Sequence, residues 1–488
     1  MPSIETAAKL FDHLDFTHAV QTFMNAFQAV STFAIRRGLL DVGLRDHDVL
    51  LFSGLMDSSS LFLTANCDTV YFITFLDVER GPVVMEVPPN VLGVVDDMWF
   101  RWVTDVGVPG PDRGQGGRYL FLPSEYDGPL PEGGYFVSRS RTNRLLVLGR
   151  AFLQNDDPAP AVTAIKRGLR IYPYRPGATG SSVASFLQGR GTFARLAPPA
   201  PPMKFAEGTG LSINTIPPND ATFFTMLDAA VQAEPADALD EELAGPLAAI
   251  GIVKGKRFHP DARMTKILTE AVALGNATSR TLGLRARDEE GFRYYDRTSA
   301  WMNPLMPGGY EFLRPPPRVG KTGVELAPNP GARLLNARTQ FFYVATGVTP
   351  AMAMTMAGIG SQYLGAFTDS QGRPFDGAKY YRVVLPRNIP AAQFWSLTLY
   401  DNQTRSMLQT DQRFPRAGSQ GYPSPAATPH ADGSTAIYFG PARPTGVPEG
   451  NWIQTLPGKG WFVALRLYSP LEPFFDKSWR PSEVDEMT

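Results

Sequence analysis

The spacing of the hydrophobic residues changes along this chain, and the changes divide it into helical and extended segments. From Glu5 to about Gly43, apolar residues recur every three or four positions, which is the period of a helix that buries one face. From Val49 onward the period is two, as in strands whose side chains point alternately to opposite faces. The sequence therefore predicts an N-terminal helix or helix pair, followed by a β-rich segment.

The β-rich segment contains short strand candidates separated by turns rich in glycine and proline. The candidates are residues 69–78, 83–87, 98–106, 118–122, 134–139 and 144–149. Short strands at such close spacing are typical of antiparallel sandwiches and jelly rolls. A helical piece is predicted at 161–174, and the proline cluster in 196–205 indicates a linker, because proline is disfavoured inside helices and central strands. We therefore expect a first domain over residues 1–200.

Helical periodicity returns between about residues 218 and 285 and interrupts the β pattern. With its flanking linkers, this helical block occupies residues 201–330. Strand candidates then recur at residues 341–348, 378–386, 392–401, 404–410, 434–440 and 461–470. The third and fourth of these are expected to form a hairpin across Asp401–Gln403. The prediction is a mainly β protein with helical segments (α+β) and two β-sandwich or jelly-roll-like domains, the second covering residues 331–488.

Composition and charge exclude several classes of protein. The 488 residues are 43% hydrophobic and 19% charged, as in globular proteins, and the net charge of −1 provides no electrostatic footprint for nucleic acid. No apolar run approaches the ~18 residues that a membrane-spanning helix needs. The first residues lack a basic segment followed by an apolar one, so the sequence as written predicts a cytoplasmic protein; export remains possible if a leader precedes it.

Neither a cofactor nor a transition metal is expected. The common nucleotide-binding, metalloprotease and serine-hydrolase motifs are absent, the five histidines are scattered, and Cys67 is the one cysteine. A single cysteine allows no intramolecular disulfide. A Ca²⁺ or Mg²⁺ site built from carboxylates remains open, because these ions bind oxygen ligands.

Strand alternation reveals unusual polar residues in the last third. In residues 461–468, Arg466 shares a face with Phe462, Ala464 and Tyr468. A solvent-facing strand would not carry so many apolar side chains, so Arg466 is expected to be half buried and to need a partner. In residues 378–386, Arg382 shares a face with Tyr380 and Val384.

The strand candidate 392–401 extends this pattern. Trp395, Leu397 and Leu399 form its core side, and the opposite side is Phe394, Ser396, Thr398 and Tyr400. Together the three strands present Arg, Tyr, Ser and Thr side chains. Two interpretations stay open: these strands form the wall of a polar pocket, or the arginines are paired at an inter-domain or subunit surface.

A second polar cluster precedes the strand candidate 69–78. Asn66 and Asp68 could cap a turn through hydrogen bonds from their side chains to the backbone. Alternatively, Asp68 acts as a general base or cation ligand beside Thr69 and Tyr71. Cys67 has no neighbouring cation or base to activate a thiolate, so a nucleophilic role is disfavoured.

These segments resemble a known pair of bacterial domains. The stretch "NCDTVYFITFLDVERGPVVMEVP" resembles domain of unknown function 1254, and "DGAKYYRVVLPRNIPAAQFWSLTLYDNQTRSML", "DGSTAIYFGP" and "NWIQTLPGKGWFVALRLYSP" resemble domain of unknown function 1214. The resemblance implies two β-rich domains, often in exported or envelope-associated proteins, and no particular reaction. The positions that match the two motifs are Asn66, Asp68, Thr69, Tyr71, Tyr381, Arg382, Trp395, Tyr400, Asp401, Asn451, Trp452, Arg466 and Tyr468.

The preferred functional hypothesis is a hydrolase acting on a small or medium organic substrate between the two β domains. Its expected catalytic residues are Asp68, Tyr71, Tyr400 and Arg466. Its expected substrate-binding residues are Asn66, Thr69, Arg382, Trp395, Ser396, Thr398 and Tyr468. The alternatives are a non-catalytic carbohydrate-binding or assembly protein, and a cofactor-free isomerase or lyase. Aromatic residues of 341–347 and 470–479, expected at the surface, further predict a homo-oligomer, either a dimer or a tetramer.

Overall fold

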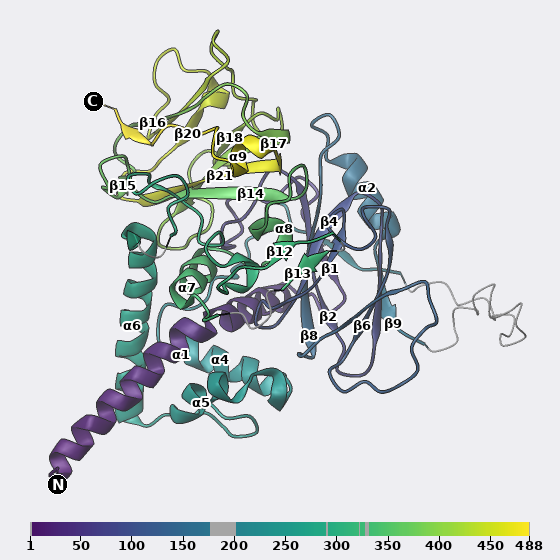
Figure 1. The fold of residues 1–488 in the computed structure, drawn as a ribbon, viewed down its shortest axis with the longest axis vertical. Coiled ribbons are helices and arrows are strands. Elements are labelled where there is room, and N and C mark those ends of the chain that lie inside the picture. Colours follow the sequence, from purple (N-terminus) through teal and green to yellow (C-terminus); the bar gives the residue numbers. More distant parts are fainter. Residues whose placement is uncertain (1, 176–201, 289–290, 322, 327–330, 488) are drawn as a thin grey trace, which may run out of the picture.

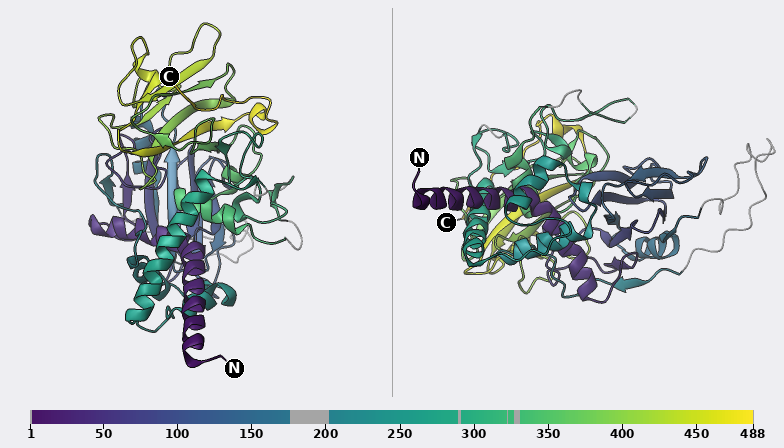
Figure 2. Two further views of the ribbon diagram at one scale, coloured as in Figure 1. Left: turned by 90° about the vertical axis from the view of Figure 1, so that its left-hand side faces the viewer. Right: turned by 90° about the horizontal axis from the view of Figure 1, so that it is seen from below.

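The computed structural model describes residues 2–175, 202–288, 291–321, 323–326 and 331–487 (Figure 1). Two β-rich regions, one from each half of the chain, are held together by helices that pack against both (Figures 1 and 2). The predicted α+β fold, with an N-terminal helix and a helical block between two β-rich regions, is confirmed.

A long N-terminal helix, α1 (Ile4–Asp41), opens the chain. The Ser3 side chain caps it by accepting a hydrogen bond from the Thr6 backbone N–H at 3.2 Å. The half that follows Ala19 is largely buried against the other helices, whereas the preceding half projects from the body of the protein (Figure 1). The prediction of a helix between Glu5 and Gly43 is thus confirmed as one continuous helix.

The N-terminal region contains two sheets. The first has the order β10-β1-β2-β8-β4-β5, and the second has the order β7-β6-β3-β9. The strands of the first are β10 (Phe205–Glu207), β1 (Val49–Leu51), β2 (Val70–Asp77), β8 (Arg144–Ala151), β4 (Val91–Asp97) and β5 (Trp102–Gly107). Those of the second are β7 (Phe136–Arg139), β6 (Gly117–Leu122), β3 (Val83–Val87) and β9 (Arg170–Pro173). Apolar side chains of both sheets share one core.

All six strand candidates of this region overlap observed strands, but the central strand β4 was not predicted. Its sequence, "VLGVVDD", ends in two aspartates and contains a glycine, which lowers its apparent β propensity. The helical piece predicted at 161–174 is confirmed only in its first part, as α2 (Ala159–Gly168); residues 170–173 form strand β9 instead. The predicted proline linker, residues 196–205, lies mostly outside the described residues.

The helical block consists of α4 (Thr222–Ala233), α5 (Glu241–Ala249) and α6 (Ala262–Leu284), with a short 3₁₀ helix at Ala236–Ala238. All three α-helices pack against α1, and α6 runs beside it (Figure 2). Aromatic side chains join them: Phe23 of α1 contacts Phe223 of α4 with ring centroids 4.5 Å apart.

The C-terminal region also has two main sheets. One has the order β11-β14-β21-β17-β18, with β15 paired to β21, and the other has the order β20-β19-β16-β22. The first contains β11 (Trp301–Met302), β14 (Ser361–Ala366), β21 (Gly460–Pro470), β17 (Ala391–Asp401), β18 (Arg416–Gly418) and β15 (Phe375–Asp376). The second contains β20 (Trp452–Gln454), β19 (Thr435–Gly440), β16 (Tyr381–Leu385) and β22 (Asp485–Glu486). Smaller elements are β12 (Arg318–Val319), β13 (Val324–Glu325), α8 (Pro350–Ala353), α9 (Glu472–Phe475) and 3₁₀ helices at Gly309–Glu311 and Glu449–Asn451.

The strand predicted at 341–348 is wrong, because the chain forms helix α7 (Leu335–Val344) there. A short apolar run has no periodicity that separates a strand from a buried helix. The expectation that its aromatic residues are exposed is also wrong: Phe341, Phe342 and Tyr343 are at most 6% exposed. The same holds for Phe474 and Trp479 in residues 470–479, which are buried in the C-terminal core. The predicted hairpin after β17 is reduced to a single bridge between Tyr400 and Met407, and β17 pairs instead with β18 and β21.

One hydrophobic core crosses the boundary between the two β-rich regions. It includes Leu148 of β8, Phe341 of α7 and Phe462 of β21. A contiguous core of this kind fixes the two regions relative to each other. Within the part of the chain that the structure describes, no helix combines the length and the apolar character needed to cross a membrane.

Candidate functional site

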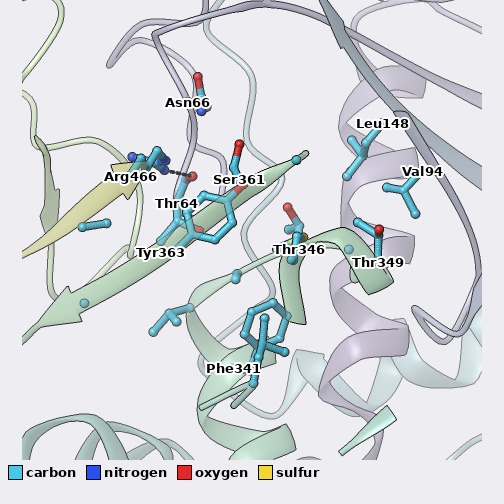
Figure 3. A pocket seen from close by; sticks show the side chains of 18 of the residues that line it. Thr64, Asn66, Val94, Leu148, Phe341, Thr346, Thr349, Ser361, Tyr363 and Arg466 are labelled. Atoms are coloured by element: carbon cyan, nitrogen blue, oxygen red, sulfur yellow. Dashed lines mark hydrogen bonds between the residues drawn. The ribbon is translucent and has the colours of Figure 1, made fainter. Parts of the chain in front are cut away.

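A cavity of about 200 Å³ lies where the two β-rich regions meet (Figure 3). One wall is the first N-terminal sheet, the opposite wall is formed by β14 and β21, and the segment from α7 to α8 closes a third side. Most of the lining is apolar, and polar groups are few. This composition is typical of sites for small organic molecules.

Strand register explains why particular side chains line the first wall. Tyr71 of β2 lies opposite Arg150 of β8. Leu148, two residues before Arg150, lies opposite Val94 of β4, and Val94 lies opposite Asp105 of β5. Opposed residues in antiparallel strands share a face, as do residues two apart in one strand. All five side chains accordingly line the cavity.

The opposite wall contains the arginine that strand alternation singled out. Arg466 of β21 lies opposite Tyr363 of β14, and Ser361 is two residues before Tyr363. In Figure 3 these side chains gather at one end of the cavity, beside Thr64 and Asn66. Arg466, expected to be half buried on a mixed face, lies on such a face but is more deeply buried than expected, at 3% exposed.

Arg466 has more hydrogen-bond donors than partners. Its Nη2 donates to the Thr64 carbonyl oxygen at 3.0 Å and to the Tyr400 hydroxyl. Its Nε and Nη1 are buried without a hydrogen-bond partner among the described residues. Burial opposes its charge, but the surrounding Tyr400 and Tyr468 hydroxyls keep the pKa of Arg466 above its ordinary value. The group therefore remains a cation.

Arg150 is a second cation at the same end of the cavity. Its Nη2 donates to Ser361 Oγ at 2.8 Å, its guanidinium lies 5.4 Å from the centroid of the Tyr468 ring, and its Nη1 is buried without a partner among the described residues. Burial opposes this charge as well, but Tyr71 and the other nearby phenols raise the pKa of Arg150. The pKa of Tyr71 is raised by burial, an effect that Arg150 only partly offsets, so its phenol keeps its proton.

Asp68, the predicted general base, is held behind the cavity and is not among the residues that line it. Its carboxylate accepts hydrogen bonds from Arg416 Nε at 2.7 Å, Ser396 Oγ at 2.6 Å and the Tyr468 hydroxyl at 2.9 Å. The Asp68 and Arg416 side chains are both 0% exposed. Asp68 is thus the anchor of a network that connects the two β-rich regions.

Asn66 links this network to the cavity. It lines the cavity, its Nδ2 donates to the Tyr468 hydroxyl at 2.5 Å, and its Oδ1 accepts from the Asp68 backbone N–H at 2.8 Å. The latter bond is the turn-capping contact that the sequence suggested. Thr69 is buried, with its hydroxyl 3.5 Å from Asn66 Oδ1. Tyr400 lies behind Arg466 and donates to the Ala65 carbonyl oxygen at 2.6 Å.

The other predicted binding residues lie away from the cavity lining. Thr398 is buried in β17, facing the same side as Ser396. Trp395 is buried in the core of the C-terminal region. Arg382 is exposed on β16, in the other C-terminal sheet, because the opposite side of that strand is the one that packs into the core.

Sequence reasoning missed Arg150, Ser361, Tyr363 and Asp105. The strand alternation that identified Arg466 applies to Arg150 as well, because Leu146, Leu148 and Arg150 share one face of β8. The strand was predicted to end at residue 149, one position too early. Within the described ranges, no group of three or more His, Cys, Asp and Glu side chains is arranged to hold a metal ion.

Two parts of the chain match described families. Residues 50–173 match the family described as protein of unknown function (DUF1254), and residues 360–472 match the family described as protein of unknown function (DUF1214). The chain pairs these two domains. The DUF1254 match contains β2, β8, β4 and β5, and the DUF1214 match contains β14 and β21. The cavity therefore lies between the two matched domains, and α7 and α8 belong to neither match.

Similarity to a solved structure extends to the fold. The crystal structure of the VPA0106 protein from Vibrio parahaemolyticus has a TM-score of 0.52 at 16% sequence identity, over 97% of this chain and 100% of that chain. An uncharacterized protein from Burkholderia cenocepacia gives a TM-score of 0.38 at 12% identity, over 97% of this chain and 95% of that chain. Among curated proteins, none matches this chain.

Proposed function

We propose that this protein binds a small organic anion in the inter-domain cavity and acts on it as a hydrolase. The observation that carries the proposal is the pair of arginines at one end of the cavity, Arg150 and Arg466, each of which has buried N–H groups without a partner among the described residues. A buried charge without a counter-charge costs several kcal/mol, so such groups are matched to a ligand or to water. A carboxylate or phosphate accepts two N–H bonds from one guanidinium and supplies the missing charge.

The Asp68 carboxylate, which interacts with Arg466, cannot take this role. Asp68 is bound to Arg416, Ser396 and Tyr468, and it does not line the cavity. No ion pair involves Arg150 or Arg466 in the described part of the chain. The apolar remainder of the lining, including Leu148 and Phe341, favours an organic rather than an inorganic anion.

Hydrolysis is supported by the groups around the arginines. Two guanidinium groups and the protonated Tyr71 hydroxyl converge at one end of the cavity. Donors arranged in this way stabilise negative charge that develops on oxygen in a transition state. In this proposal Tyr71, Arg150 and Arg466 contact the substrate, whereas Asp68 and Tyr400 hold Tyr468 and Arg466 in position.

Calorimetric titration tests the binding proposal. With hexanoate and hexyl phosphate as probes, Arg150→Gln and Arg466→Gln are each expected to weaken binding about tenfold or more, since a charged hydrogen bond contributes ~1.5–3 kcal/mol. Arg382→Gln, on the exposed face of β16, is the matched control and should bind as the wild type does. Wild-type protein that binds neither probe, or arginine variants that bind equally well, would contradict the proposal.

Turnover tests the hydrolase proposal separately. Esters and amides that also carry a free carboxylate should be cleaved with incorporation of oxygen from labelled water, and Tyr71→Phe should lower kcat more than it changes KM. Conversion without incorporation of labelled oxygen would indicate an isomerase or lyase instead. Binding without any conversion would indicate a non-catalytic binding protein.

We also propose self-association, through α1 rather than through the aromatic residues named from the sequence. Leu10, Phe11 and Leu14 are at least 50% exposed and Ile4 is 92% exposed, on one side of the projecting half of α1. On another side of this half-helix, Asp12 and Asp15 form ion pairs with Arg263 of α6. A second copy that covers the apolar side would make a dimer, which could associate further into a tetramer.

A further inference from the structure

The cavity has a second polar end, built around Asp105. Asp105 lies opposite Val94, which lies opposite Leu148, and Leu148 is two residues from Arg150. Two strand spacings of ~4.8 Å and two residues of ~3.4 Å separate the Cα atoms of Asp105 and Arg150 by ~12 Å on one face of the sheet. In Figure 3, Val94, Leu148 and Thr349 lie on the side of the cavity away from Arg466.

Asp105 is buried without a positive partner. Its side chain is 5% exposed, its Oδ1 has no hydrogen-bond partner, and no ion pair forms on it among the described residues. Burial raises the pKa of Asp105 to about 7, and the nearby Thr349 and Trp102 offset this only in part. A carboxyl group that lines a cavity and has no cationic partner can bind a positively charged group of a ligand.

In the described part of the chain, the groups packed around Asp105 supply no positive charge. Asp96, on the adjacent strand β4, is buried and accepts a hydrogen bond from the Val348 backbone N–H at 2.8 Å, and burial raises its pKa well above the ordinary value. Tyr310, next to Trp102, is likewise a weak acid whose pKa burial raises. By strand register, the apolar side chains of Val94 and Leu148 lie between Asp105 and Arg150 in the lining.

We propose that the ligand of this cavity is zwitterionic, with a carboxylate bound by Arg150 and Arg466, an apolar spacer and a protonated amine bound by Asp105. This inference rests on the proposed anion site and adds its second recognition element. A protonated amine fits Asp105 better than a hydroxyl group does, because a charge-assisted hydrogen bond is about twice as strong as a neutral one. Such a ligand would place a negative charge beside the two arginines and a positive charge beside Asp105.

Calorimetry with matched probes tests the inference. A series of ω-amino carboxylates of increasing length is compared with n-alkyl carboxylates of equal length. At the best length, the amino compound is expected to bind the wild type at least about tenfold more tightly, as for a charged hydrogen bond. Asp105→Asn should abolish that preference and leave binding of the alkyl carboxylate within about twofold.

Asp96→Asn is the control, because Asp96 is buried beside the cavity but does not line it. It should keep the preference for the amine, and thermal melts should show that both variants fold. Alkyl carboxylates that bind in an Arg150-dependent way, with no preference for the amine at any length, would overturn this inference and leave the anion site intact. A preference that survives in Asp105→Asn would also overturn it. Failure of both probe classes to bind would overturn the anion site itself.

Discussion

Asp68 and Arg416 form an ion pair at 2.7 Å between two side chains that are both fully buried. The pair joins the loop before β2 of the N-terminal region to β18 of the C-terminal region. Ser396 and Tyr468 satisfy further hydrogen bonds of the same carboxylate. The polar cluster that begins at Asn66 therefore holds the two regions together at the edge of the cavity.

Removing one partner of this pair should be strongly destabilising. Arg416→Met leaves the Asp68 carboxylate buried without its counter-charge, and we expect the free energy of unfolding to fall by ~3–5 kcal/mol. Asp68→Asn leaves Arg416 unpaired and should have a loss of similar size. Denaturant unfolding of each variant measures the loss.

The double variant Asp68→Leu/Arg416→Met provides the internal control. Replacing both charges by apolar groups removes the unpaired ion, so the double variant should be more stable than either single variant. Single variants with stability close to the wild type would show that the pair does not hold the two regions together.

Removing the charge of Arg150, in contrast, should not lower the free energy of unfolding. It has no ion-pair partner among the described residues, so Arg150→Met removes a desolvated charge and leaves no carboxylate unpaired. We expect the free energy of unfolding without ligand to stay within ~1 kcal/mol of the wild type or to rise, while binding of anions is lost. Differential scanning calorimetry with and without hexanoate separates the two effects. A loss of several kcal/mol in the absence of ligand would assign Arg150 a structural role.

The sequence predicted those parts of the site that depend on local periodicity. Alternation in β21 and β17 placed Arg466, Ser396 and Tyr400 on one buried face, and the register of the strands confirms it. The same rule would have found Arg150 had the predicted strand continued to its observed end. No local pattern pairs Asp68 with Arg416, which is 348 residues away, because that contact depends on how the two regions pack.

Local patterns were also insufficient where the surroundings decide the structure. Residues 341–343 are three aromatic residues in succession, which suit a strand or a buried helix equally well. Packing selects the helix. The ring centroids of Phe342 and Phe100 are 5.4 Å apart in a stacked arrangement, and those of Tyr343 and Phe27 of α1 are 5.3 Å apart. The cavity wall formed by α7 was for that reason not predictable from the strand pattern.

Self-association through α1 predicts a change of mass in a surface variant. Leu10→Glu/Phe11→Glu places charge on the exposed apolar side of the helix, which a second copy could cover only at a large desolvation cost. Light scattering at micromolar concentration should give an oligomeric mass for the wild type and a monomeric mass for the double variant. Lys9→Glu adds charge on the opposite side of the same turn and should keep the oligomer. A monomeric wild type would contradict the proposal.

Asp105 should make the stability of the protein depend on pH in a predictable direction. Its pKa is about 7 in the folded state and ~3.9 in an unfolded chain. Between these values the folded state binds more protons, so the contribution of Asp105 to the free energy of unfolding falls as pH rises from about 4 to 7 and is constant above. Asp105→Asn removes this contribution and should gain stability relative to the wild type on going from pH 5 to pH 8.

The comparison between variant and wild type removes the contributions of titratable groups that do not interact with Asp105. Burial also raises the pKa of Glu234 to about 7, but Glu234 is present in both proteins and cancels in the difference. Urea unfolding at several pH values measures the difference in the free energy of unfolding between the variant and the wild type. We expect this difference to grow between about pH 4 and pH 7 and to level off near pH 7. A saturating ω-amino carboxylate should reverse the trend, because the bound amine favours the ionised form of Asp105. A difference that does not change with pH would show that Asp105 is ionised throughout and is compensated by another group.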